Sequence, residues 1–214
     1  MTKIIVVRHA QSLANEKGIF IGHMDMDLSE LGKKQAELLG KYLLDKTFPI
    51  DVIYSSDLLR PYHTVKPYAE AVGKEIIKDK ELREIYAGKW EGNRFDELTE
   101  LFPASYPIWR SDIGKCQCDG GESVAELYDR INSAIDRIAE ENDGKCVLIA
   151  THATPLRCLM ARATGVGCDG MKDIKWCENT GINIFEYSRG ALEASELYIS
   201  EHLGEMRSGL PRSV

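Results

Sequence analysis

The sequence contains no apolar run long enough to cross a membrane, no internal repeat and no low-complexity segment. A membrane-spanning helix needs about 20 consecutive apolar residues, and the apolar run at residues 4–7 is also too short for a signal peptide. A basic composition is lacking as well, since the formal net charge of the 214 residues is −7. Sequence-independent binding to nucleic acid needs positive surface. We therefore expect a cytoplasmic protein that binds neither membranes nor nucleic acid.

A disulfide framework is not expected either. The six cysteines lie at positions 116, 118, 146, 158, 168 and 177, and in a cytoplasmic protein of this size they indicate reduced thiols. Cys116 and Cys118 form a C-x-C pair, but no second pair follows at the spacing of a zinc site. The segment GVGCDG at 165–170 spells G-x-G-x-x-G, yet it follows a predicted helix and not a strand, which disfavours a dinucleotide site.

What the sequence does contain is a regular alternation of strand-like and helix-like segments. Short β-branched apolar runs such as KIIVV predict buried strands, and longer segments with apolar residues at helical spacing predict helices. The predicted strands cover 3–7, 51–55, 74–78, 145–151, 182–188 and 192–200. The predicted helices cover 29–46, 58–72, 123–142 and 155–164. This alternation predicts an α/β fold, a three-layer α/β/α sandwich with a mostly parallel sheet.

The same segments suggest how the chain is organised. Residues 1–200 are predicted to form one domain, which is long enough to bury a full core. The irregular stretch 86–121, with its Gly, Pro, Tyr and Trp residues, is predicted to be a cap insertion over one end of the sheet. Residues 201–214 form a C-terminal tail to which the sequence assigns no role.

Polar residues follow three of the predicted strands. The first strand ends at Arg8 and His9, the second is followed one helical turn later by Arg60, and the strand at 145–151 ends at His152. In open α/β sheets, ligands bind beyond the carboxyl ends of the strands. We therefore expect these two arginines and two histidines to lie together.

Such a cluster suits phosphoryl transfer. Arginine binds phosphate oxygens through two parallel hydrogen bonds and stays charged, and a neutral imidazole is a competent nucleophile toward phosphorus. Neighbouring cations lower the pKa of an imidazole and keep it neutral. The reaction also needs an acid to protonate the leaving oxygen, for which Glu84 is the candidate and Glu81 and Glu91 are the alternatives.

Several motifs of the chain, in order, resemble those of the histidine phosphatase superfamily, in its phosphoglycerate mutase-like branch. RHAQS (8–12) with Asn15 is similar to R-H-G-E-[ST]-x-x-N, and SSDLLRPYHTV (55–65) to S-x-L-x-R-x-x-x-T. LREIYAGKWEG (82–92) is similar to L-x-E-x-x-x-G-x-W-E-G, and GGES (120–123) and THATPLR (151–157) match the late motifs. The small phosphatases of the branch, such as α-ribazole phosphatase and broad-specificity phosphatase, are the most similar members.

The resemblance implies a phosphoglycerate mutase-like fold with a short cap and a set of residue roles. His9 would become phosphohistidine and Glu84 would act as general acid and base. The phosphate- and substrate-binding residues would be Arg8, Gln11, Asn15, Ile21, Gly22, Arg60, His152 and Ala153, with Ile21, Gly22 and Ala153 contributing backbone. The resemblance implies no metal and no organic cofactor.

The sequence favours a phosphomonoesterase acting on a small phosphorylated metabolite. A phosphoglycerate mutase would need more cations than the four between Glu84 and Gly120, and a non-catalytic phospho-ligand-binding protein would typically lack one of the catalytic groups. Both remain alternatives. Trp90 and Trp109 are predicted either to line the pocket or to pack the cap, and Trp176 is predicted to pack. The oligomeric state, monomer or homodimer, stays open.

Overall fold

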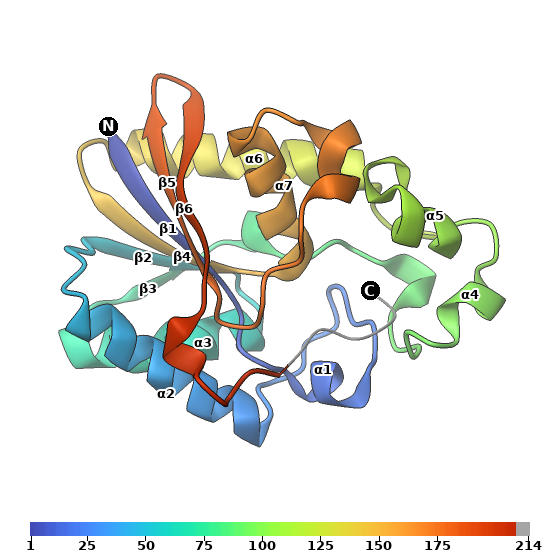
Figure 1. The fold of residues 1–214 in the computed structure, drawn as a ribbon, viewed down its shortest axis with the longest axis horizontal. Helices are drawn as coiled ribbons and strands as arrows, with labels where there is room; N and C mark the ends of the chain where they lie inside the picture. The colour runs from blue at the N-terminus through green and yellow to red at the C-terminus, as the bar shows by residue number, and fades with distance from the viewer. Residues whose placement is uncertain (209–214) are drawn as a thin grey trace.

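The computed structural model describes residues 1–208 of the chain. Its centre is a six-stranded sheet with the strand order β3-β2-β4-β1-β5-β6 (Figure 1). The strands are β1 (Thr2–Arg8), β2 (Val52–Ser55), β3 (Ile76–Lys78), β4 (Cys146–Thr151), β5 (Ile182–Ser188) and β6 (Ala191–Ile199). The first four run parallel, and β5 and β6 add an antiparallel pair at one side. The predicted α/β fold with a mostly parallel sheet is confirmed.

The four predicted helices are present, with small differences at their ends. They are α2 (Glu30–Asp45), α3 (Leu59–Val72), α6 (Val124–Glu141) and α7 (Ala153–Ala163). Ser29 caps α2 by accepting a hydrogen bond from the Gly32 amide, and Gly73 ends α3 in the left-handed region, with φ at 65°. Helix α7 begins two residues before Pro155, because a proline in the first turn of a helix lacks only an N–H that would be unpaired there.

Each face of the sheet is covered by a pair of helices. Side chains alternate between the two faces of a strand, so Ile5 and Val7 of β1 pack with α2 and α3, whereas Ile4 and Val6 pack with α6 and α7. All four side chains are fully buried. Figure 1 shows the resulting three layers, with α2 and α3 on one side of the sheet and α6 and α7 on the other.

The insertion 86–121 lies beyond one end of the sheet and holds more helix than its composition predicted. Figure 1 shows its short helices α4 (Leu98–Leu101) and α5 (Tyr106–Ser111) at this end, and a bridge between Ile19 and Arg94 joins the insertion to the segment after α1 (Leu13–Lys17). Trp90 is fully buried and contacts the Tyr106 ring edge-on at 5.4 Å between centroids. Aromatic packing, and not a regular hydrophobic repeat, therefore holds the cap together.

The first part of the predicted tail lies against α2. The Tyr42 hydroxyl donates a hydrogen bond to the Glu201 carboxylate, and the Gln35 side-chain amide donates one to the Met206 carbonyl. Residues 209–214 of that tail lie outside the described residues. Within residues 1–208, no helix is both long enough and apolar enough to span a membrane.

Candidate active site

The ends of three neighbouring strands form the base of the site. β4 lies between β1 and β2 in the sheet, and the chain beyond each strand continues the pairing. The His9 amide donates to the Thr151 carbonyl at 2.9 Å, and the Ser56 amide donates to the Ala150 carbonyl at 2.9 Å. The rings of His9 and His152 consequently meet edge to face, with centroids 5.2 Å apart.

A cavity of about 70 Å³ opens above these strand ends. Eight of the ten residues predicted for the site line it: Arg8, His9, Asn15, Ile21, Gly22, Arg60, Glu84 and Ala153. We call it the catalytic cavity. Its walls come from segments that are far apart in the sequence, since β1, α3, the start of α7 and the cap all contribute.

His9 is 4% exposed and is held as a neutral ring. Its Nδ1 lies 2.7 Å from the Ala10 carbonyl oxygen, which only accepts hydrogen bonds, so Nδ1 carries the proton and Nε2 keeps its lone pair. Burial lowers the pKa of His9 well below its ordinary value, and the charges of Arg60 and Arg8 lower it further. The sequence predicted that the two cations lower this pKa, but burial is the larger cause of the shift.

Both arginines are buried and anchored to backbone carbonyls. Arg60 Nη2 donates to the Gly22 carbonyl at 2.8 Å and Nη1 to the Met24 carbonyl at 3.1 Å. Arg8 Nη1 donates to the Cys177 carbonyl at 2.6 Å, while its buried Nε has no hydrogen-bond partner within residues 1–208. Burial lowers the pKa of Arg60 to about 10, so the guanidinium remains charged at neutral pH. Two fixed positive charges therefore face the cavity.

His152 and Gln11, the other two predicted residues, do not line the catalytic cavity. His152 is fully buried behind His9, and its Nε2 lies 3.0 Å from the Ser56 hydroxyl. Its Nδ1 is buried and has no partner in the described part of the chain. Gln11 turns the other way, and its side-chain oxygen accepts a hydrogen bond from the Ser29 hydroxyl at 2.6 Å. The structure thus brings His152 to the site and directs Gln11 toward α2.

Among the described residues that line the cavity, Glu84 alone carries a carboxylate. Its two oxygens accept hydrogen bonds from the amides of Ile85, at 2.9 Å, and Thr154, at 3.3 Å. The alternative acids lie elsewhere. The Glu91 carboxylate accepts from two backbone amides, and the Glu81 carboxylate lies at the surface, 3.9 Å from the ammonium group of Lys80.

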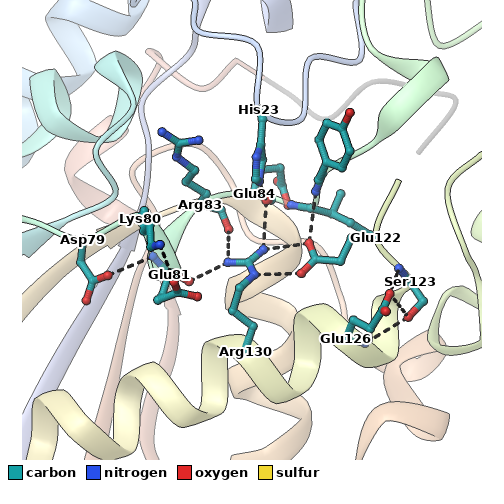
Figure 2. A network of polar contacts seen from close by, with 12 residues as sticks. His23, Asp79, Lys80, Glu81, Arg83, Glu84, Glu122, Ser123, Glu126 and Arg130 are labelled. Carbon is teal, nitrogen blue, oxygen red and sulfur yellow. Dashed lines mark hydrogen bonds and ion pairs between the residues drawn. The ribbon is translucent and has the colours of Figure 1, made fainter. Parts of the chain in front are cut away.

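The backbone that carries Glu84 is held by Arg130 of α6. Figure 2 shows this guanidinium reaching the carbonyls of the 81–84 segment, with hydrogen bonds of 2.6 Å to Glu81, 3.2 Å to Arg83 and 3.2 Å to Glu84. The Glu122 carboxylate accepts two more bonds from Arg130, each of 2.8 Å. Glu122 belongs to the GGES motif, so this motif acts behind the cavity and not within it.

Another part of the lining, which we call the aromatic side, is apolar and mostly aromatic. Its lining side chains are Ile19, Phe20, Phe95, Trp109 and Trp176. Trp90, in contrast, packs inside the cap. Of the two roles predicted for the cap tryptophans, Trp109 therefore lines the pocket and Trp90 packs the cap. Trp176, predicted to pack, both lines the cavity and stacks on the Arg157 guanidinium, which lies 4.1 Å from its ring centroid.

Two polar residues that position the site were not identified from the sequence. Asn179 donates from its side-chain nitrogen to the His9 carbonyl at 2.8 Å, and no sequence signal marks it. Thr64 accepts a hydrogen bond from the Ala10 amide at 2.8 Å and donates to the Arg60 carbonyl at 2.6 Å. Thr64 thereby ties the nucleophile loop to the second arginine, and the final Thr of the S-x-L-x-R-x-x-x-T pattern was its signal.

Sequence comparison gives relatives over nearly the whole chain. Phosphoserine phosphatase 1 of Hydrogenobacter thermophilus is 35% identical over 205 residues, which cover 96% of each protein. The metal-independent phosphoserine phosphatase of Arabidopsis thaliana is 31% identical over 82% of this chain and 79% of its own length.

Solved structures and a family model show the same relationship as these sequence relatives. YhfR of Bacillus stearothermophilus superposes with a TM-score of 0.89 at 26% identity, over 95% of this chain and all of that one. A phosphoserine phosphatase of Entamoeba histolytica superposes with a TM-score of 0.83 at 25% identity, with the same coverage. Residues 4–200 match the family model of branch 1 of the histidine phosphatase superfamily. The chain therefore belongs to the histidine phosphatase superfamily.

Proposed function

We propose that the protein is a phosphomonoesterase that hydrolyses a small phosphorylated metabolite through a phosphohistidine on His9. One observation carries the proposal: a neutral, buried imidazole with a free Nε2 shares a cavity with two buried guanidinium groups. Arg8, on the cavity wall, and His152, beside His9 but outside the cavity lining, carry buried nitrogens, Nε and Nδ1, without a partner in residues 1–208, and we assign both as donors to phosphoryl oxygens. Relatives named as phosphatases support the same class of reaction.

In the first step, His9 Nε2 forms a bond to phosphorus while the bond from phosphorus to the leaving oxygen breaks. Arg8, Arg60 and His152 hold the phosphoryl oxygens, whose charge must be neutralised. We assign the Ser56 hydroxyl as the donor to His152 Nε2, 3.0 Å away, so that Nδ1 carries the hydrogen that donates to the substrate. Glu84 acts as the general acid and gives a proton to the leaving oxygen.

In the second step, water attacks the phosphohistidine. The Glu84 carboxylate accepts a proton from this water as the new oxygen–phosphorus bond forms and the nitrogen–phosphorus bond breaks. Inorganic phosphate leaves, and His9 and Glu84 return to their starting states. The chemistry needs only side chains of this chain, which supports a metal-independent reaction, as in the relative so named.

The aromatic side of the catalytic cavity favours a phosphatase over a mutase. A mutase must hold two phosphate groups within reach of one histidine, and in the described lining of this cavity Arg8 and Arg60 are the only cations. Of the cap cations, Arg94 pairs with Asp96 at 3.1 Å and Lys115 with Asp112 at 2.7 Å. Three relatives are named phosphoserine phosphatases, so O-phosphoserine is the first metabolite to test.

The direct test is hydrolysis of p-nitrophenyl phosphate with EDTA present. We expect turnover by the natural protein and a loss of at least about 10⁴-fold in His9→Ala, which removes the nucleophile. His63→Gln, which changes a histidine of α3 outside the catalytic cavity, is the matched control and should keep its activity. An unchanged rate in His9→Ala would remove the mechanism.

A further inference from the structure

A second cavity adjoins the aromatic side of the catalytic cavity. Its volume is about 240 Å³, and it shares Trp109 and Trp176 with the catalytic cavity. We call it the basic cavity, because its wall also carries four cationic side chains: Arg110, Arg157, Lys172 and Lys175. Asp173 supplies a carboxylate to the same wall. In a chain with a net charge of −7, this is a local excess of positive charge.

Two residues that line this cavity, Arg157 and Trp109, each carry a buried hydrogen-bond donor without a partner among the described residues. Arg157 is 4% exposed, stacks on Trp176 and donates from Nη2 to the Met171 carbonyl at 2.5 Å. Arg157 Nε and Trp109 Nε1 are both buried and lack a partner in the described part of the chain. Buried donors are normally paired, so each unpaired one calls for an explanation.

In the described part of the chain, none of the four cations forms an ion pair with a carboxylate. The ion pairs of residues 1–208 involve other arginines and lysines, so Asp173 is the one carboxylate in the described lining of this cavity and it pairs with none of the four cations. A buried guanidinium without a carboxylate is costly unless something else compensates it. An oxyanion would accept from the free donors and balance the charge at once.

We propose that the basic cavity binds an oxyanion, a carboxylate or a phosphate group. Two sources share this chemistry: a second anionic group on the leaving group of the substrate, or a free anion from solution. The first source rests on the proposed function and would define the substrate class. The rings of Trp109 and Trp176 lie 6.2 Å apart between centroids and line both cavities. An anion held behind them is recognised but not presented to His9.

The first arm of the test measures specificity. It compares kcat/KM for 6-(phosphonooxy)hexanoate and for hexyl phosphate, which differ by the distal carboxylate. We expect the natural protein to prefer the carboxylate by about tenfold. The variant Arg110→Gln/Lys172→Gln/Lys175→Gln, whose three positions are exposed, should lose this preference.

A matched variant controls for net charge. Lys33→Gln/Lys34→Gln/Lys41→Gln removes three exposed lysines from α2, away from both cavities. It should keep the preference for the carboxylate, because long-range attraction is screened beyond about 10 Å in 0.1 M salt. Loss of the preference in both variants would mean that general charge, and not the basic cavity, produced it.

The second arm measures binding without turnover, by equilibrium dialysis against labelled inorganic phosphate. We expect two phosphates per natural chain and one per Arg110→Gln/Lys172→Gln/Lys175→Gln chain. A second phosphate without a substrate preference would assign the site to a free anion. One phosphate in both proteins and no preference would overturn the proposal. A protein that binds two phosphates but hydrolyses nothing would refute the proposed function and leave the anion site standing.

Discussion

The two sides of the catalytic cavity are built in different ways. The phosphate side, with Arg8, His9, Arg60 and Glu84, comes from the end of β1, the start of α3 and the loop after β3, where hydrogen bonds to the backbone fix the side chains. The aromatic side comes from the cap, from the segment after α1 and from the loop before β5, and its aromatic residues contact one another through rings, as between Trp109 and Trp176.

This difference separates two tasks. Groups that stabilise a phosphoryl transition state must be preorganised, since their effect depends on a fixed orientation. A leaving group, in contrast, is bound mainly by apolar area and shape. We therefore expect changes on the phosphate side to affect turnover strongly, and changes on the aromatic side to affect substrate preference with small losses.

Glu84→Gln should give a larger loss of turnover than Arg130→Ala, which acts behind the phosphate side, or Trp176→Leu, which acts on the aromatic side. Glutamine can still accept a hydrogen bond from the Ile85 or Thr154 amide but cannot transfer a proton. We expect kcat to fall by about 10³-fold on an alkyl phosphate, and by only about tenfold on p-nitrophenyl phosphate, whose leaving group needs little protonation. Equal losses on the two substrates would contradict the role of Glu84 as the acid.

Arg130→Ala should give an intermediate effect, because it releases the backbone that carries Glu84 without touching the cavity. We expect a loss of about 10- to 100-fold in kcat on alkyl phosphates. In the Glu84→Gln background the same change should add little, since the positioned group is already absent. Arg130→Lys should restore little, because one ammonium group cannot reach the carbonyls and Glu122 together. Fully additive losses would show that Arg130 acts on folding alone.

The protonation state of His9 tests the phosphate side directly. An ordinary histidine, with a pKa near 6.5, is about 90% protonated at pH 5.5. Because burial, Arg60 and Arg8 lower the pKa of His9, its neutral form should persist at pH 5.5. Ring nitrogen chemical shifts measured by NMR report this, with the urea-unfolded chain as the control. A midpoint near pH 6.5 in the folded protein would contradict the electrostatic argument.

Trp176→Leu should give the smallest effect. It removes an aromatic surface from the leaving-group side and leaves the groups around phosphorus in place. We expect KM for an aryl phosphate to rise by about 2- to 10-fold with kcat nearly unchanged. Trp176→Phe should recover most of the loss. A large fall in kcat would erase the distinction between the two sides.

The same distinction explains what the sequence could predict. The strands were predictable because runs such as residues 4–7 are continuously apolar and β-branched, and His9 and His152 stand where such runs end. The roles of Asn179 and Trp176 were not predictable, because the loop that carries them has no periodicity and its place beside β1 depends on tertiary packing. Gln11 was predicted from its position in a motif to bind phosphate, but its side chain points toward α2, because a motif position does not fix the direction of a side chain.

The central claim is a covalent phosphoryl group on His9, and the most direct measurement is its capture. The protein is mixed with a 32P-labelled phosphomonoester, quenched in alkaline denaturant because phosphohistidine is labile in acid, and digested. We predict a transient label on the peptide that contains His9, absent from His9→Ala. Steady hydrolysis with no label on His9, or with the label on another residue such as Ser12, would contradict the account.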